Sequence, residues 1–165
     1  PDGIREGRVE VRVITAQGAS EPFPLMSARR APALLAPPAF RGNGRQYVAA
    51  LHADGVFAGP VDLIPGAAFR PARTGDALVL YGIGFGPSSP GIPAGEIAQA
   101  AAALPEVAIT LDGTPATILY AGPAVGFVGL FQINLVVPPG LSGDVAINVS
   151  VQGVASPQNL VLGVL

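Results

Sequence analysis

The segment Gly143-Asp144-Val145-Ala146-Ile147-Asn148-Val149-Ser150-Val151-Gln152-Gly153 decides how this chain folds. Hydrophobic and polar side chains alternate over residues 145–151, which is the period of a β-strand with one buried and one solvent-facing side. The Gln-Gly pair that follows favours a tight turn, because glycine adopts the positive φ that such turns require. The segment therefore predicts one strand of a β-hairpin, and residues 160–165 supply the returning strand.

The first 27 residues repeat the last 28. Apolar, glycine and proline positions coincide when two one-residue gaps are allowed: Gly7, Val9, Val11, Val13, Gln17-Gly18, Pro22 and Leu25 align with Gly143, Val145, Ile147, Val149, Gln152-Gly153, Pro157 and Leu160. The repeat predicts a second hairpin at the N-terminus. Because an isolated two-stranded hairpin is at best marginally stable in water, we expect it to pack on the rest of the chain, to belong to a truncated domain, or to pair with another molecule.

The composition favours an all-β fold with more apolar surface than a single monomer can bury. Charged residues make up only 12% of the chain, and 22 Gly and 18 Pro punctuate it throughout, as in proteins built of short strands and tight turns. A length of 165 residues accommodates one domain with an appendage. The mean hydropathy of +0.51 is high for a soluble monomer, and this predicts association.

The chain divides into three predicted parts: a β-hairpin over residues 1–27, an Ala/Pro-rich linker over 28–38, and a β-sandwich over 39–165. The sandwich is expected to contain seven short strands, at residues 46–52, 76–83, 106–111, 117–120, 128–137, 144–151 and 160–165. Two longer connections separate them, at 57–75 and 84–104. The Ala-rich end of the second connection, 97–104, favours one or two helical turns.

Charge and cysteine content exclude several classes of function. All nine positive charges are Arg and the net charge is −2, so no basic stripe indicates nucleic-acid binding. The absence of cysteine excludes disulfides, thiolate catalysis and Cys-based zinc sites. Residues 113–143 carry no ionised side chain, but prolines, Gln132 and Asn134 interrupt them, which predicts buried strands rather than a membrane span. Because the chain starts at Pro1 without Met, we expect a processed form.

Candidate catalytic residues are few and isolated. His52 is the only histidine, and although Asp54 and Asp62 follow it, no further ligand or nucleophile is indicated. We therefore expect a structural histidine beside a turn. The glycine-rich run at 82–86 is followed by no amphipathic helix that could bind phosphate, and it favours a strand exit where side chains would collide. We expect no enzyme activity, no cofactor and no metal.

Two segments are candidates for glycosylation. Asn148-Val149-Ser150 has the N-linked acceptor pattern, and strand alternation turns Asn148 outward. Ser88 and Ser89 lie between prolines in an expected exposed loop, with no pattern of a catalytic serine around them. A plain surface role is the simpler interpretation for all three residues.

Several motifs, in order over residues 31–165, resemble a known family. They are Ala31-Pro32-Ala33-Leu34-Leu35, Val48-Ala49-Ala50-Leu51-His52-Ala53-Asp54-Gly55, Gly75-Asp76-Ala77-Leu78-Val79-Leu80-Tyr81-Gly82-Ile83-Gly84-Phe85-Gly86-Pro87, Leu111-Asp112-Gly113-Thr114-Pro115-Ala116, Leu119-Tyr120-Ala121-Gly122 and Gly126-Phe127-Val128-Gly129-Leu130-Phe131-Gln132-Ile133-Asn134. This succession resembles the uncharacterised Solibacter-type C-terminal domain family. The resemblance implies an immunoglobulin-like module of a bacterial secreted or cell-surface protein, and it implies that residues 1–27 are the last two strands of an earlier module.

The sequence therefore favours a role in assembly. A sheet fragment with an uncovered apolar face is commonly completed by another chain, so we expect a homo-oligomer or filament, joined head-to-tail through the hairpin. The expected interface residues are Val9, Val11, Val13, Phe23 and Leu25. The alternative is an adhesion or carbohydrate-binding module, which binds a surface polysaccharide through the loops at 57–75 and 84–104.

Overall fold

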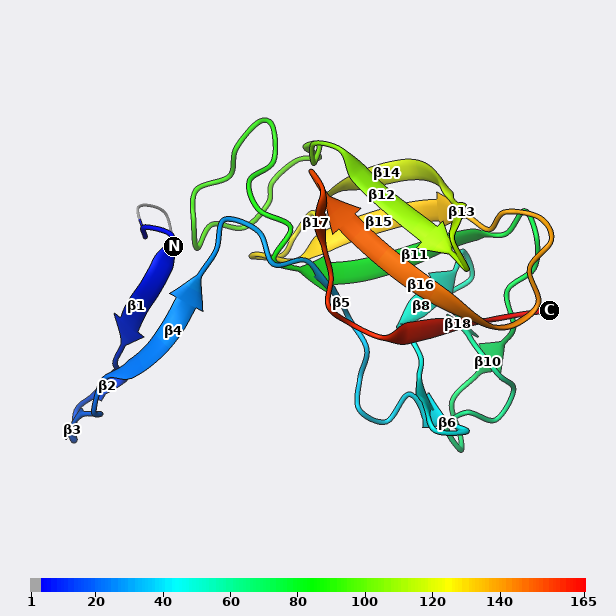
Figure 1. The fold of residues 1–165 in the computed structure, drawn as a ribbon, viewed down its shortest axis with the longest axis horizontal. Helices are drawn as coiled ribbons and strands as arrows, with labels where there is room; N and C mark the ends of the chain where they lie inside the picture. The colour runs from blue at the N-terminus through cyan, green and yellow to red at the C-terminus, as the bar shows by residue number, and fades with distance from the viewer. Residues whose placement is uncertain (1–3) are drawn as a thin grey trace.

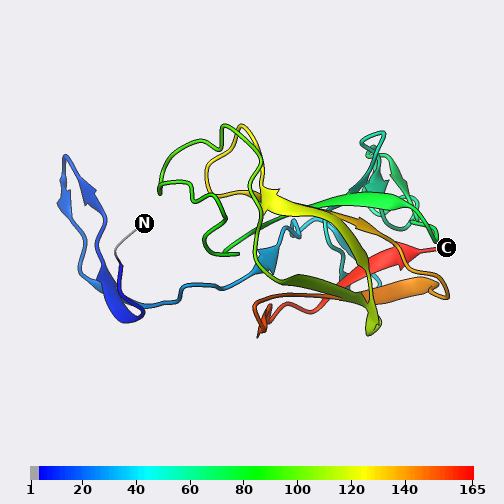
Figure 2. The same cartoon turned by 90° about the horizontal axis from the view of Figure 1, so that it is seen from above.

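The computed structural model describes residues 4–165, which form a β-hairpin and a β-sandwich (Figure 1). In the hairpin, β1 (Gly7–Val11) pairs antiparallel with β4 (Phe23–Ser27), and the short strands β2 (Ile14–Thr15) and β3 (Gly18–Ala19) form its tip. The hairpin projects from one end of the sandwich in both ribbon views (Figures 1 and 2). The described residues contain no helix, and the predicted all-β class is confirmed.

The first sheet of the sandwich has seven strands. They are β5 (Ala33–Leu34), β8 (Ala50–His52), β9 (Phe57–Ala58), β10 (Phe69–Arg70), β11 (Ala77–Ile83), β14 (Thr117–Pro123) and β15 (Phe131–Val136), in the order β10-β9-β8-β11-β15-β14, with β5 paired to the end of β11. The central strand β11 pairs with a strand on each side, and Leu78 lies opposite both His52 of β8 and Leu135 of β15.

The second sheet has five strands. They are β12 (Val107–Leu111), β13 (Thr114–Pro115), β16 (Gly143–Val151), β17 (Val154–Ala155) and β18 (Leu160–Val164). The long strand β16 pairs with β12 on one edge and with β17 and β18 on the other. A small separate hairpin joins β6 (Arg41–Gly42) to β7 (Arg45–Gln46). The predicted immunoglobulin-like strand order stays a prediction.

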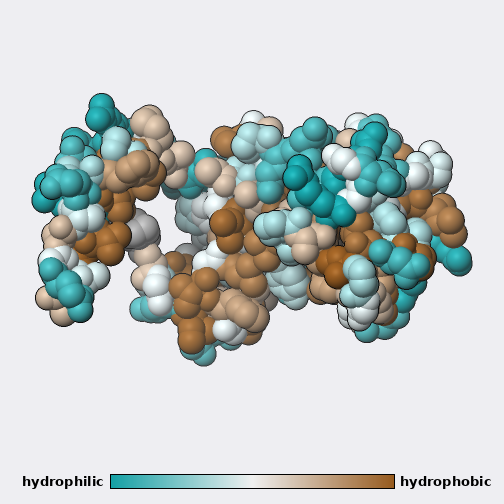
Figure 3. Space-filling view, turned by 90° about the horizontal axis from the view of Figure 1, so that it is seen from below, coloured by the Kyte–Doolittle hydropathy of each residue, from teal (hydrophilic) through white to brown (hydrophobic). Residues whose placement is uncertain are grey.

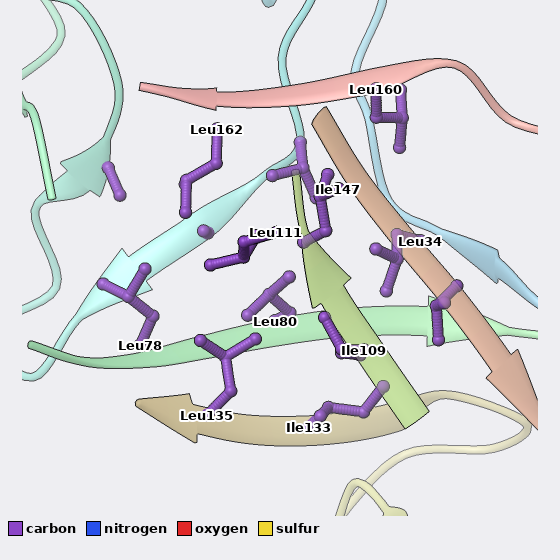
Figure 4. Close-up of a cluster of buried hydrophobic side chains, with 14 of the residues drawn as sticks. Leu34, Leu78, Leu80, Ile109, Leu111, Ile133, Leu135, Ile147, Leu160 and Leu162 are labelled. Atoms are coloured by element: carbon purple, nitrogen blue, oxygen red, sulfur yellow. The ribbon is translucent and has the colours of Figure 1, made fainter. Parts of the chain in front are cut away.

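The core lies between the two sheets, which are seen edge-on in Figure 2. Side chains of the first sheet meet those of the second (Figure 4), and they are fully or almost fully buried. The first sheet contributes Leu78, Leu80, Ile133 and Leu135, and the second contributes Ile109, Leu111, Ile147, Leu160 and Leu162. Alternation along β16 explains this arrangement, since its odd-numbered residues from 145 to 151 are all buried. Burial of each such side chain contributes about 1.5–3 kcal/mol.

A smaller aromatic cluster closes one end of the sandwich. The rings of Phe40 and Phe57 meet edge-on with centroids 4.9 Å apart, and Phe69 stacks on Phe57 at 5.3 Å. Tyr47 is buried in the same cluster, and its hydroxyl donates a 2.7 Å hydrogen bond to Asp144 Oδ1. Burial and this hydrogen bond raise the pKa of Tyr47 to about 12.

Three sequence expectations differ from the structure. Residues 97–104 form no helix, because their backbone groups pair with other loops: Ala98 N donates to Phe127 O (3.0 Å), and Leu104 N donates to Ala121 O (2.9 Å). The strand expected to begin at Val128 begins at Phe131, since residues 124–130 form a loop with left-handed glycines at 126 and 129. Residues 33 and 34, within the predicted linker, form β5 of the first sheet.

The strand exit after β11 holds the linker in place. Ala31 N donates a 2.8 Å hydrogen bond to Gly84 O. Gly84 has a φ of +75°, and a Cβ on it would collide with the carbonyl oxygen of Ala31. A Cβ on Gly86 would lie 3.0 Å from the carbonyl oxygen of Arg29. Glycine is therefore required here by close approach, as the sequence predicted, and the linker is anchored to the sandwich from Arg29 onward.

Candidate functional site: an uncovered hairpin face

The hairpin has one apolar face and one face that mixes charged and apolar residues. In the β1–β4 register, Val9 lies opposite Leu25 and Val11 opposite Phe23, whereas Arg8 lies opposite Met26 and Glu10 opposite Pro24. Opposite residues of an antiparallel pair project to the same side of the sheet. The first two pairs therefore share one face. Val13 lies two residues beyond the end of β1, where its carbonyl oxygen accepts a 2.9 Å hydrogen bond from Ser20 N.

This apolar face is uncovered. Val9 is partly buried, while Val11, Val13, Phe23 and Leu25 are exposed, and Phe23 is exposed to 65%. Hydrophobic side chains gather on the side of the hairpin that faces the sandwich across an open space (Figure 3). We call these five residues the hairpin face. They are the residues that the sequence predicted as an assembly interface, and the β1–β4 register places four of them, Val9, Val11, Phe23 and Leu25, on one face.

The hairpin has the same backbone geometry as the end of the chain. Gly7, Val9 and Val11 lie opposite Ser27, Leu25 and Phe23, and in the same way Gly143, Val145 and Ile147 of β16 lie opposite Val164, Leu162 and Leu160 of β18. Further along, Ser20 N donates to Val13 O at 2.9 Å, just as Ser156 N donates to Val149 O at 2.9 Å. Residues 7–27 therefore repeat the unit β16–β17–β18 in register and not only in sequence.

The register corrects one detail of the sequence alignment. Phe23, and not Leu25, occupies the position of Leu160, while Leu25 corresponds to Leu162. Both assignments put Leu25 on the same face, because they differ by two residues. The error arises after the turn, where the stretch from Ser20 to Phe23 is one residue shorter than the stretch from Ser156 to Leu160.

The two copies differ in what covers them. Leu160 is exposed to only 5% and packs under the first sheet of the sandwich, whereas its counterpart Phe23 is exposed to 65%. The same contrast holds between Ile147 and Val11, and between Val149 and Val13. The C-terminal copy shows that this kind of hairpin face is built for burial under a β-sheet, and the described residues leave the N-terminal copy without that cover.

His52 occupies a structural position. It is buried, its Nε2 donates to the carbonyl oxygen of Arg70 at 3.3 Å, and its Nδ1 lies 3.6 Å from Asp76 Oδ2. Asp54 turns instead to the Arg70 guanidinium at 2.6 Å, and this hydrogen bond lowers the pKa of Asp54. Within residues 4–165, no group of three or more His, Asp or Glu side chains could hold a metal ion.

The glycosylation candidates lie on two different parts of the surface. Asn148 is exposed on β16, between the buried Ile147 and Val149, as the alternation predicted. Ser88 is partly buried and its hydroxyl donates to Pro90 O at 2.9 Å, while Ser89 is exposed and pairs through its backbone with Ala103. The part of the chain that the structure describes has no helix long and apolar enough to cross a membrane.

Sequence reasoning missed a second exposed apolar surface. Four large side chains on two loops are each more than half exposed: Ile97, Val125, Phe127 and Val128. We call these residues the loop patch. Their sequence signal is an apolar run at 124–131, but the sequence predicts a buried strand from residue 128 of that run onward. Glycines within the run, at 126, 129 and on its flank at 122, were the available sign of a loop.

Comparison of the chain with protein-family models, with curated proteins and with solved structures found no match. The resemblance to the Solibacter-type family therefore stays a prediction, and the function has to be argued from the geometry of the hairpin and the sandwich.

Proposed function

We propose that this protein is an extracellular structural subunit that joins head-to-tail to copies of itself through its N-terminal hairpin, and that repeated joining builds a filament. One observation carries the proposal: the hairpin face is exposed, although the equivalent face of β16–β18 is buried in the core of the same chain. The extracellular location rests on the predicted resemblance to the Solibacter-type family.

Burial of the hairpin face would supply a substantial driving force. One fully buried Val, Leu or Phe side chain contributes about 1.5–3 kcal/mol, and the face carries five such side chains. Association costs about 4–15 kcal/mol in lost translational and rotational freedom. Several of the five side chains acting together are therefore needed to offset that cost, which makes a single charged substitution on the face highly disruptive.

Unpaired strand edges support a β-type contact. The hairpin sheet contains only β1 and β4, so each of these strands has one edge without a partner strand among the described residues. In the C-terminal copy, the equivalent edge of β16 pairs with β12. An exposed edge is a template for pairing with another chain, so strand complementation fits the hairpin.

The contact is head-to-tail because a complete sandwich already fills its own equivalent position. The unit β16–β18 lies under the first sheet, where it contributes seven residues to the core: Val145, Ile147, Val149, Val151, Leu160, Leu162 and Val164. The incoming hairpin would have to displace this unit to enter the core. Docking on a different, outer surface avoids that cost, and a contact between unlike surfaces generates rings or open filaments.

The test compares three full-length chains by analytical ultracentrifugation and negative-stain electron microscopy. The wild type is expected to assemble, and Val11→Asp is expected to stay monomeric with an unchanged sandwich, as judged by thermal unfolding. Val154→Asp is the matched control, because Val154 also lies in an antiparallel strand and is exposed to 43%, against 42% for Val11. A wild type that stays monomeric at high concentration would disprove the proposal.

A second candidate function is that of an adhesion or carbohydrate-binding module. The observation that favours it is a pocket formed by the predicted loop 84–104 and the loop after β14, with Ser88 and Glu96 among its lining residues. Saturable binding of a cell-surface polysaccharide to monomeric protein, lost in Glu96→Ala, would support this function. The apolar character of the remaining lining favours the assembly role.

A further inference from the structure

The loop patch is an exposed apolar surface built from residues other than those of the hairpin face. Its two loops are fixed to each other by backbone hydrogen bonds: Ala98 N donates to Phe127 O at 3.0 Å, and Gly126 N donates to Ala98 O at 2.9 Å. The exposed side chains of Ile97, Val125 and Val128 are therefore held on a defined framework. Exposed apolar side chains that gather on one part of a surface are a common feature of protein contact sites.

A pocket lies beside the patch and is continuous with it. It has a volume of about 230 Å³, and Phe127 and Val128 of the patch form part of its wall together with Ile92, Ala98, Leu130 and Phe131. The only ionisable residue of its lining is Glu96. A pocket of this size is smaller than the usual range of about 300–1,000 Å³ for small-molecule sites, and it suits one large apolar side chain.

The hairpin face offers such a side chain. Phe23 is the largest residue of the face, and it is 65% exposed. None of the five residues of the face is charged, so no ionised group of the face would be desolvated on contact with the apolar pocket. Aromatic side chains that fill a pocket at the centre of an interface commonly carry most of its binding energy.

The hairpin of the same copy is held away from the loop patch. β4 ends at Ser27, and the chain is anchored again at Arg29, which packs on Gly86, and at Ala31, which is bonded to Gly84. Only Ala28 separates the strand from the anchor. This short connection directs the hairpin outward (Figure 2), and both apolar surfaces stay uncovered within one copy (Figure 3).

A cleft lies between the base of the hairpin and the pocket beside the patch. It has a volume of about 720 Å³, and it runs from Ile4 and Glu6 at the base of the hairpin to Ile92 and Phe131, which also line the pocket. The cleft and the apolar pocket therefore adjoin each other.

From these contacts we infer that the loop patch is the acceptor for the hairpin of a second copy of this chain, with Phe23 of the incoming hairpin in the pocket beside Phe127. The inference rests on the proposed head-to-tail assembly, and it names the second surface that this assembly requires. Each copy then offers one donor, the hairpin face, and one acceptor, the loop patch.

The test uses two full-length variants that each lose one surface. Val11→Asp loses the donor and keeps the acceptor, whereas Val128→Asp loses the acceptor and keeps the donor. Each variant alone is expected to be monomeric. An equimolar mixture is expected to form a one-to-one complex of twice the 16.5 kDa chain mass, because one intact donor can meet one intact acceptor and the complex cannot grow further.

Two controls keep the result interpretable. Val61→Asp places the same charge on another exposed valine, in the loop between β9 and β10 and away from the patch, and it should assemble like the wild type. Phe127→Ala removes the pocket wall without adding a charge, and it should weaken assembly at least tenfold. Thermal unfolding of each variant verifies that its sandwich is folded.

The outcomes separate this inference from the proposed function. If wild type assembles and Val11→Asp does not, but Val128→Asp and Phe127→Ala assemble like the wild type, the hairpin is the donor and the acceptor inference is wrong. Dimers formed by Val128→Asp alone would indicate hairpin-to-hairpin contact and would also overturn it. A monomeric wild type would remove both proposals together, whereas the one-to-one complex supports both.

Discussion

Phe23 and Leu160 occupy equivalent positions in the two hairpins, so the same substitution at each separates folding from association. Leu160→Ala removes a side chain that is only 5% exposed in the core, and it should lower the free energy of unfolding by about 2–5 kcal/mol. Phe23→Ala removes a side chain that is 65% exposed and lies outside that core. The stability of the sandwich should therefore change little.

The loss in Phe23→Ala should appear in association instead. Full burial of Phe contributes about 1.5–3 kcal/mol, and roughly two thirds of its surface is still available for burial. The substitution should then weaken association by about 1–2 kcal/mol, which is about 5- to 30-fold in the association constant. Urea unfolding of dilute protein measures the first quantity, and sedimentation equilibrium over a concentration series measures the second.

The reasoning is refuted by the opposite distribution of effects. If Phe23→Ala destabilises the dilute monomer as much as Leu160→Ala does, the hairpin shares a core with its own sandwich. If Phe23→Ala leaves both stability and association unchanged, the hairpin face is not an interface.

Two further predictions concern the sandwich. Gly84→Ala and Gly113→Ala both place Ala at a φ near +77°, with a strain of about 1–2 kcal/mol. Only Gly84 faces a backbone atom, the carbonyl oxygen of Ala31, whereas Gly113 has open space around it. Gly84→Ala should therefore show the larger fall in melting temperature. Burial and the hydrogen bond to Asp144 raise the pKa of Tyr47 to about 12 from an unfolded value of 10.0. The contribution of Tyr47 to stability is therefore complete below pH 10 and is lost as the pH rises through 12. Urea unfolding between pH 9 and 12 should show a steeper decline in the free energy of unfolding for the wild type than for Tyr47→Phe.

Local sequence patterns predicted the elements whose structure is set locally. The alternation in β16 predicted both the strand and its buried face, since a period of two residues is visible without knowledge of the partner strand. Residues 97–104 had no such pattern, and alanine alone favoured a helix. Their conformation depends on distant partners such as Phe127 and Ala121, which a single sequence does not reveal.

The sequence predicted the two candidate surfaces to very different degrees. The hairpin face could be predicted from the repeat, because Val9, Val11 and Val13 reproduce a pattern that the C-terminal copy explains. The loop patch could not, since Ile97 and Val125 come from loops that are distant in sequence and meet only through the hydrogen bonds at Ala98. An apolar run that faces solvent also has the same composition as a buried strand, and only the folded chain distinguishes the two.

The hairpin face and the loop patch both consist of exposed apolar residues, which accords with the high mean hydropathy of +0.51. One uncovered apolar surface would be satisfied by a symmetric dimer, in which the same residues meet across a two-fold axis. This chain has two uncovered surfaces, built from different elements and held apart by a linker anchored at Gly84 and Gly86. Two unlike surfaces on one rigid subunit cannot both be covered in a symmetric hairpin-to-hairpin dimer, which buries one of them and leaves the other exposed. The proposed head-to-tail arrangement would cover both surfaces in every interior subunit, because each hairpin face meets the loop patch of the next copy.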